Sequence, residues 1–285
     1  MLDGVISGLV SGSAYAILAV CVVVLYRLVG VLNFGQAALG ALGAYVCYAL
    51  VGAEVSLALA VFCGLAVASV TAGFSGWVLA RWLGEPSAIV RSVGTVVLLI
   101  LLLTAGFRLF GDSPRAMPSL VPEASFDLGG VRVSLTTVIA LLVTVAIAGA
   151  LSLLLRYTQI GIRLEAMSER PLTVQLLGVN SRRLAVGVWA ATGLLSTLAM
   201  LLIAPTRNPT FESMSFLVVP ALAAGLLGAF SNVWIAVASG LAIGAVEGAG
   251  ARIDGLADYR GAIPFAIIIV ALIWLHRREV WDAAR

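Results

Sequence analysis

Long apolar runs alternate with short polar segments along most of this chain, and each run extends over about 20 residues. That length matches the hydrocarbon core of a bilayer when a helix crosses it. The runs lack the period-two alternation of apolar and polar positions that a transmembrane β-barrel requires. The pattern therefore predicts an all-α polytopic membrane protein with about eight or nine transmembrane or half-inserted helices. We place these segments at residues 4–26, 28–51, 55–80, 90–110, 134–155, 184–204, 215–230, 233–251 and 261–276.

Two of these segments have the composition of interrupted helices. The segment 28–51 contains Asn33 and Gln36, whose amides need partners inside a membrane. The segment 215–230 is short and contains Pro220, so it is predicted to be half-inserted. Glycine makes the first of them irregular, at Gly30, Gly35, Gly40 and Gly43.

The composition supports a membrane protein and excludes most soluble classes. The 285 residues are 61% hydrophobic and 11% charged, with a mean hydropathy of +1.11, whereas soluble domains are about 25% charged. No separate soluble region is visible, so residues 1–285 are predicted to form one membrane domain. The three cysteines lie inside apolar runs and are interpreted as packing residues rather than as disulfide or metal-binding pairs.

Arginine alone supplies the positive charge and indicates how the chain lies in the membrane. If nine segments cross, eleven arginines fall on one side and six on the other, and the richer side is predicted to be cytoplasmic. The N-terminus then faces outward, and residues 111–133 form an external loop with a short hairpin around Gly129 and Gly130. Scattered loop arginines do not favour nucleic-acid binding. The richer side carries Arg27, Arg81, Arg91, Arg156, Arg163, Arg170, Arg182, Arg183, Arg277, Arg278 and Arg285.

The sequence lacks the motifs of an enzyme. It has no lysine and hence no standard phosphate-binding loop, so ATP hydrolysis by that route is excluded. It has neither a Ser-His-Asp set nor an HExxH motif, and we expect no catalytic residue, metal site or cofactor in this chain. Of the acidic residues, only Glu247 comes near the middle of a span.

Asn33 and Gln36 are the candidates for substrate contact. On a helix, residues three apart share a face, and Gly35 and Gly40 would allow free backbone groups to meet a substrate. The alternative is an interhelical hydrogen bond between the two amides and their neighbours. The sequence does not decide between these two roles.

Glycines four residues apart predict two faces for close helix packing. One lies on the segment 233–251, where Glu247 stands beside it, and the other lies on the first span. We interpret Glu247 either as a hydrogen-bonded carboxylate near Arg252 or as a residue of the translocation path. The packing glycines are Gly8 and Gly12 on the first span and Gly240, Gly244 and Gly248 on the later one.

The most charged stretch is the loop 156–183, "RYTQIGIRLEAMSERPLTVQLLGVNSRR". Gly161 opens one helical pattern, Pro171 suits the first turn of a second, and Gly178 suits the position after its end. Two short helices with one apolar and one basic side fit a loop lying in the lipid headgroups. They fit a docking element for a cytoplasmic partner equally well.

Four ordered blocks resemble a known family. They are "GLVSGSAYAILAVCVVVLYRLVGVLNFGQAALGALGAY", "GIRLEAMSERPLTVQLLGVNSRRL", "VVPALAAGLLGAFSNVWIAVASGLAIGAVEGAG" and the final run ending in "HRREVW". In this order they resemble the permease subunits of ABC importers for branched-chain amino acids, the high-affinity Leu/Ile/Val type. The chain departs from the family at Gln36 and Ala37, at Arg170 before the loop proline, and at "GAFSN", where the family carries paired glycines.

The resemblance implies a transport subunit in a bacterial inner membrane. Its partners would be a second permease subunit, two cytoplasmic ATPases that bind ATP and Mg, and a periplasmic or lipid-anchored substrate-binding protein. The substrate would be an apolar amino acid, although relatives import urea and short amides; a stand-alone secondary transporter is the other alternative. The family's ATPase-coupling loop matches Gly161, Arg163, Glu165, Ala166, Glu169, Arg170, Pro171, Leu176, Leu177 and Gly178.

Overall fold

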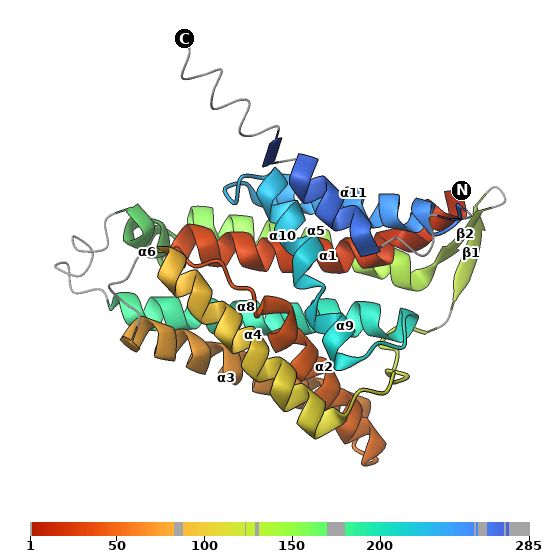
Figure 1. Ribbon diagram of the computed structural model, residues 1–285, viewed down its shortest axis with the longest axis horizontal. Helices are drawn as coiled ribbons and strands as arrows, with labels where there is room; N and C mark the ends of the chain where they lie inside the picture. The colour runs from red at the N-terminus through yellow and green to blue at the C-terminus, as the bar shows by residue number, and fades with distance from the viewer. Residues whose placement is uncertain are drawn as a thin grey trace, which may run out of the picture.

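The computed structural model is a bundle of helices with one small hairpin near the N-terminus (Figure 1). It describes residues 2–82, 88–122, 124–128, 131–169, 180–253, 255, 261–270 and 272–273. The elements are α1 (Leu2–Val29), α2 (Gln36–Gly52), α3 (Leu57–Trp82), α4 (Ala88–Phe110), β1 (Ser125–Leu128), β2 (Val131–Ser134), α5 (Leu135–Tyr157), α6 (Gln159–Glu169), α8 (Ser181–Ile203), the 3-10 turn η1 (Ala204–Thr206), α9 (Phe211–Ser215), α10 (Val218–Leu227) and α11 (Val233–Gly250).

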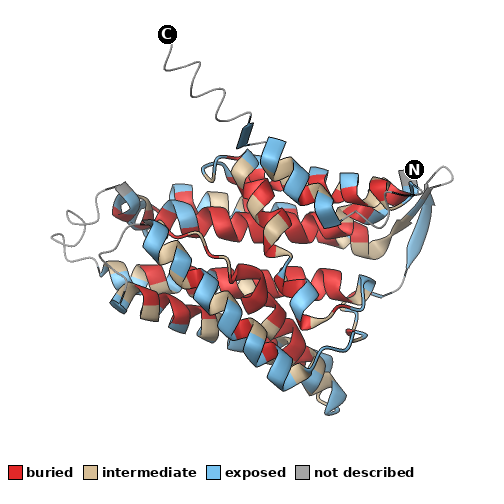
Figure 2. Ribbon diagram, in the orientation of Figure 1, coloured by how far each residue is buried: buried red, intermediate tan, exposed pale blue. Residues whose placement is uncertain are grey.

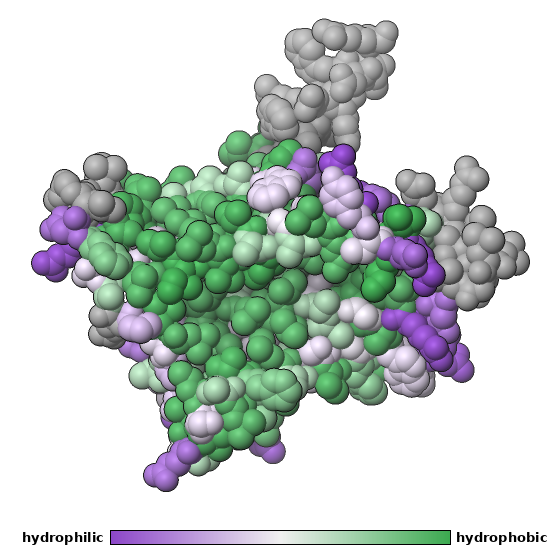
Figure 3. Space-filling model, turned by 180° about the vertical axis from the view of Figure 1, so that it is seen from behind, coloured by the Kyte–Doolittle hydropathy of each residue, from purple (hydrophilic) through white to green (hydrophobic). Residues whose placement is uncertain are grey.

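The predicted fold class is confirmed. Within the described residues, six helices are long and apolar enough to cross a membrane, and the helices 36–52 and 211–227 are apolar but shorter. Apolar side chains cover the flank of the molecule, while hydrophilic ones gather mainly at the two ends of its long axis (Figure 3). The helix α1 is almost entirely buried and lies at the centre of the bundle (Figure 2).

Arginines mark one end of the bundle. Arg27, Arg81, Arg91 and Arg156 lie at helix ends on the same side as α6, and we call this end, which the charge pattern predicts to be cytoplasmic, the inner end (Figure 1). The outer end carries the N-terminus and the hairpin of β1 and β2, which pair antiparallel with Leu128 opposite Val131. A hairpin is therefore present where the sequence predicts one.

The first interruption lies between α1 and α2, within the predicted span 28–51. Gly30 has φ +71°, a conformation that favours glycine, and its N–H bonds to the Tyr26 carbonyl at 2.9 Å, so α1 ends there. Residues 30–35 then run without a helix into the bundle interior, where α2 begins (Figure 1). Hydroxyl groups of α4 form hydrogen bonds with the non-helical backbone of this segment. The Thr95 hydroxyl accepts from the Phe34 N–H at 3.0 Å and donates to the Leu32 carbonyl at 2.8 Å.

The second interruption lies at the start of the predicted span 215–230. The short helix α9, capped by the side chain of Thr210, ends at Ser215, and α10 begins at Val218. After α10, Ala229 and Phe230 both have positive φ, +48° and +51°, in the turn that leads to α11. The Asn232 side chain caps α11 by accepting from the Trp234 and Ile235 N–H groups.

The two interrupted segments belong to a repeated arrangement. The helix α1 packs against α11, and α8 packs against α3 in the same way. The interrupted segment after α1 contacts α3 and α8, while that after α8 contacts α11 and α1. Since α1 runs from the outer to the inner end and α8 runs back, the second set has inverted direction (Figure 1). Transporters with such repeats place their pathway beside the interrupted helices.

Candidate functional site

Close packing of α1 against α11 positions the first functional side chain. The predicted packing glycines meet here: Gly8 and Gly12 of α1 lie against Gly240, Gly244 and Gly248 of α11. A Cβ on Gly240 would come 2.6 Å from the Ala16 backbone nitrogen, so the two backbones touch directly. Glu247 follows Gly244 by three residues, which puts its carboxylate on the face of α11 that meets α1.

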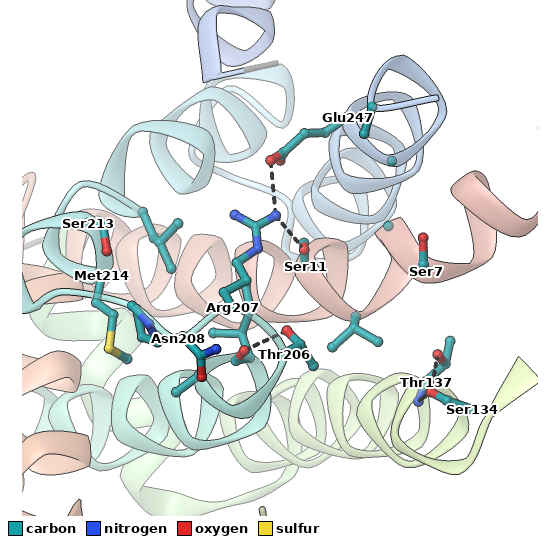
Figure 4. A pocket seen from close by; sticks show the side chains of 18 of the residues that line it. Ser7, Ser11, Ser134, Thr137, Thr206, Arg207, Asn208, Ser213, Met214 and Glu247 are labelled. Atoms are coloured by element: carbon teal, nitrogen blue, oxygen red, sulfur yellow. Dashed lines mark hydrogen bonds and ion pairs between the residues drawn. The ribbon is translucent and has the colours of Figure 1, made fainter. Parts of the chain in front are cut away.

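Glu247 is buried in a cluster of polar side chains. Its side chain is 8% exposed. The Tyr15 hydroxyl donates to Glu247 Oε2 at 2.6 Å, and Arg207 Nη2 donates to Glu247 Oε1 at 3.0 Å. Arg207 Nη2 also donates to Ser11 Oγ at 2.7 Å (Figure 4). The partner of Glu247 is thus Arg207. The sequence had suggested Arg252 instead.

Arg207 reaches the cluster from the loop that follows α8. The turn η1 ends the helix, and Asn208 has φ +44°, which reverses the chain. The Pro209 carbonyl then accepts from the Tyr45 hydroxyl at 2.9 Å and from the Arg115 N–H at 3.2 Å, so this loop is held from two sides. No sequence pattern pointed to Arg207, because only the returning loop brings it to residues of α1 and α11.

These side chains open into a cavity of about 680 Å³, which we call the outer cavity. It lies between the outer ends of α1 and α11 and the loop after α8 (Figure 4). Ser7, Ser11, Arg207 and Glu247 form part of its polar wall. Its apolar wall includes Val10, Ile203, Met214 and Leu217. A cavity of this size holds a small molecule that has both polar and apolar parts.

In the outer cavity Arg207 and Glu247 balance each other, and Arg252, which is exposed, also lines the cavity. Burial opposes the charge of Arg207, but the neighbouring Tyr15 and Glu247 oxygens outweigh it and raise the pKa of the guanidinium overall. The pair adds little net stability, because Glu247 must be desolvated to form it while the Arg207 side chain remains 35% exposed to solvent. The pair can therefore open at modest cost to a ligand that brings its own opposite charges. A carboxylate would meet Arg207 while an ammonium meets Glu247.

Asn33 and Gln36 lie where α2 meets α8, outside the outer cavity. Asn33 precedes α2 rather than lying on it, so the two side chains do not share a helix face as the spacing suggested. The Asn33 amide donates to Gln36 Oε1 at 2.8 Å, and Gln36 Nε2 donates to Ser196 Oγ at 2.6 Å and to the Thr192 carbonyl at 3.0 Å. Both side chains are fully buried.

Gly35 and Gly40 belong to the same junction. A Cβ on Gly40 would come 2.6 Å from the Ser196 carbonyl, so α2 lies directly on α8 there. The Gly35 N–H donates to Asn33 Oδ1 at 3.0 Å. Four of the five residues predicted for the substrate path thus form an interhelical junction and do not line the outer cavity, whereas the fifth, Glu247, does.

The residues predicted to form the coupling loop lie partly within α6. Thr158 ends α5, and its hydroxyl accepts from the Gly161 N–H at 3.1 Å, which starts α6 after a sharp turn. Arg163 and Ala166 are exposed, while Glu165 forms an ion pair with Arg27 at the end of α1. Glu169 is the last residue of α6. The remaining predicted coupling residues lie outside the described ones: Arg170, Pro171, Leu176, Leu177 and Gly178.

No group of three or more His, Cys, Asp or Glu side chains that could hold a metal occurs among the described residues. The cysteines Cys21, Cys47 and Cys63 are free, and the first two are buried among the helices.

Comparison with known proteins identifies the family. The high-affinity branched-chain amino acid transport system permease protein BraD of Pseudomonas aeruginosa is 23% identical, and the match covers 96% of this chain and 93% of the relative. The corresponding permease protein LivH of Escherichia coli (strain K12) is 25% identical over 95% of this chain and 92% of its own length. No solved structure matches the chain significantly. The family described as "Branched-chain amino acid transport system / permease component" matches residues 4–272, and the chain therefore belongs to this family of transport permeases.

Proposed function

We propose that this chain is the membrane permease subunit of an ATP-driven importer for branched-chain or other apolar amino acids, in a bacterial inner membrane. It would form half of the translocation path together with a second permease subunit. Its relatives BraD and LivH are named as permeases of high-affinity branched-chain amino acid transport systems.

The Arg207–Glu247 pair in the outer cavity is the observation that carries this proposal. An amino acid crosses as a zwitterion, and its two charged groups match the guanidinium and the carboxylate one to one. The neighbouring Val10, Met214 and Leu217 offer an apolar surface to a branched side chain. Glu247 therefore stays in the proposed path, joined by Arg207, whereas we assign Asn33 and Gln36 to holding the interrupted helix.

Energy must come from another chain, because this one has no phosphate-binding loop. We propose that two cytoplasmic ATPase subunits bind ATP and Mg and dock at the inner end, on the loop that begins with α6. The ion pair of Glu165 with Arg27 supports this route, because it links α6 to the end of α1 just before the interruption at Gly30. A binding protein on the outer side would deliver substrate to the outer cavity.

The charge of the outer cavity also bears on the alternatives. Urea and short amides are neutral and do not need a pair of opposite charges in the cavity wall. A stand-alone secondary transporter needs an ion-coupling residue, and Glu247 is already paired with Arg207 and Tyr15. Both features favour the amino acid importer.

Uptake of labelled leucine into proteoliposomes tests the proposal. The vesicles would hold this chain, its second permease and the ATPases, with binding protein and ATP added. Glu247→Gln should lower uptake at least tenfold, since one charge-assisted bond of about 2 kcal/mol is lost. Glu54→Gln, an exposed carboxylate at the outer end, serves as the control and should transport normally. Full uptake without ATP, or equal uptake by both variants, would contradict the proposal.

A further inference from the structure

A second large cavity lies at the inner end of the bundle. It has a volume of about 860 Å³, and we call it the inner cavity. It is enclosed by the end of α1, the end of α3, the start of α4, α6, the start of α8 and the turn after α10. Because these are ends of four helices that are long and apolar enough to cross a membrane, we expect the cavity to lie at the depth of the lipid headgroups.

The charge of the inner cavity does not balance. Arg27, Arg91 and Arg182 line it, and among the described residues no acidic side chain does. Glu165, which lies beside the cavity, pairs with Arg27. Among the described residues, the other two arginines, Arg91 and Arg182, form no ion pair with an acidic side chain. In the outer cavity, by contrast, Arg207 is paired with Glu247, and Arg252 adds a second arginine at an exposed position. A zwitterion suits the outer cavity, whereas a ligand with net negative charge suits the inner one.

Two buried hydrogen-bonding groups in this cavity have no partner among the residues that the structure describes. Arg91 donates one bond, from Nη1 to the Val29 carbonyl at 3.2 Å, while its Nε is buried and unbonded. The Ser181 hydroxyl, in the first turn of α8, is also buried and unbonded. Native proteins leave few such groups, and an absent ligand is one reason for them. Both groups can donate a hydrogen bond to an anion's oxygen, and the start of α8 adds the favourable end of a helix dipole.

The rest of the inner cavity is apolar and aromatic. Leu28, Leu79 and Trp189 line it, and the Tyr26 ring lies 5.3 Å from the Phe230 ring on one side. A free inorganic anion would leave this wall without a partner. A ligand with an anionic head and a hydrocarbon part would cover both regions.

We propose that the inner cavity binds the phosphate group of an anionic phospholipid from the cytoplasmic leaflet. Arg91, Arg182 and the Ser181 hydroxyl contact the phosphate, and the acyl chain begins along the apolar wall. The lipid would join α1, α4 and α8 at the place where α1 gives way to the interrupted segment. The proposal does not depend on the transported substrate, and lipid binding can be measured without transport.

Native mass spectrometry of the purified full chain tests this assignment. The chain would be titrated with phosphatidylglycerol and, separately, with phosphatidylcholine, which has the same phosphate but no net charge. We expect tighter binding of phosphatidylglycerol and a loss of about fivefold for each arginine changed to glutamine at Arg91 and Arg182. Arg81→Gln is the matched control, because this exposed arginine lies at the same end but outside the cavity. It should bind the lipid as the native chain does.

Further measurements distinguish a phospholipid from free phosphate as the ligand, and a further variant covers the case in which the arginine variants do not fold. Excess inorganic phosphate should displace little lipid; displacement as effective as that by soluble phosphatidylglycerol would overturn the lipid assignment. If the arginine variants do not fold, Ser181→Ala keeps both charges and should still weaken binding about fivefold. Unchanged lipid affinity in Ser181→Ala and in the arginine variants that fold would refute the site. An equal loss in Arg81→Gln would also refute it, because binding would then follow surface charge alone.

Discussion

The contact between α1 and α11 leads to a prediction about Gly244→Ala. A Cβ at Gly244 would lie 2.6 Å from the Gly8 carbonyl oxygen, which is 0.8 Å closer than the 3.4 Å at which ordinary van der Waals contact begins. It would also overlap the Gly12 backbone. Neither neighbour is a flexible side chain, so the added methyl group can be accommodated only if one helix moves away from the other.

The size of the effect follows from this geometry. Overpacking by one methyl group at a rigid contact costs about 1–3 kcal/mol, and the alanine recovers only about 0.5–1 kcal/mol of helix propensity. The net result is a loss of stability. Glu247 lies one turn further along α11, so moving this helix also lengthens its 2.6 Å hydrogen bond from Tyr15. We therefore expect transport to fall together with stability.

Thermal unfolding in detergent measures the first effect. A thiol-reactive dye reports unfolding directly, because Cys21 and Cys47 are buried in the folded chain. Gly187→Ala is the matched control: it makes the same substitution in a helix, but its Cβ would meet nothing within 4 Å. The control should be as stable as the native chain or slightly more stable. If Gly244→Ala unfolds at the same temperature as Gly187→Ala, the close packing described here is wrong.

Three further predictions concern the strained turn, the inner ion pair and the buried junction. Ala229→Gly should stabilise the chain by about 1–2 kcal/mol in the same unfolding assay, because Ala229 has φ +48°; Ala238→Gly, within α11, should instead destabilise it by about 1 kcal/mol. Arg27→Glu should uncouple ATP hydrolysis from transport while changing stability by no more than about 1 kcal/mol. Adding Glu165→Arg should restore the ratio of leucine transported to ATP hydrolysed. If this ratio does not recover, the Arg27–Glu165 pair does not link α6 to α1 in coupling. Gln36→Leu should destabilise the chain by about 1–3 kcal/mol, since it leaves the buried amide of Asn33 unpaired, and an unchanged unfolding temperature would contradict the junction.

Local features of the sequence predicted the first interruption better than the second. Glycine and amide residues within 28–51 are features that break a helix, and the structure breaks this segment at residues 30–35. Asn33 lies in this break before α2, because α1 continues to Val29 and ends at Gly30. In the second segment Pro220 lies in the first turn of α10, where proline is tolerated, and the break falls before it at residues 216–217.

The partners across the bundle could not be predicted in this way. Tyr15 and Glu247 are 232 positions apart, and Arg207 belongs to a loop that looks external in the sequence. Their meeting depends on the direction in which that loop turns back. A glycine pattern predicts that a face packs closely, but it does not say against which helix or in what register. The sequence therefore gave Glu247 as a candidate and missed the arginine that completes its cluster.

The placement of the two cavities constrains how this permease can change conformation. Both border α1: the outer cavity near Ser11 and the inner cavity near Arg27. Direct backbone contact fixes α1 to α11, so these two helices move together. The backbone outside the long helices lies in the interrupted segments, at residues 30–35 and 204–217. Movement of α6 would reach the first segment through the Arg27–Glu165 pair, while opening of the Arg207–Glu247 pair would release the second. We therefore expect the α1–α11 pair to pivot as a unit between these interruptions, closing one cavity as the other opens.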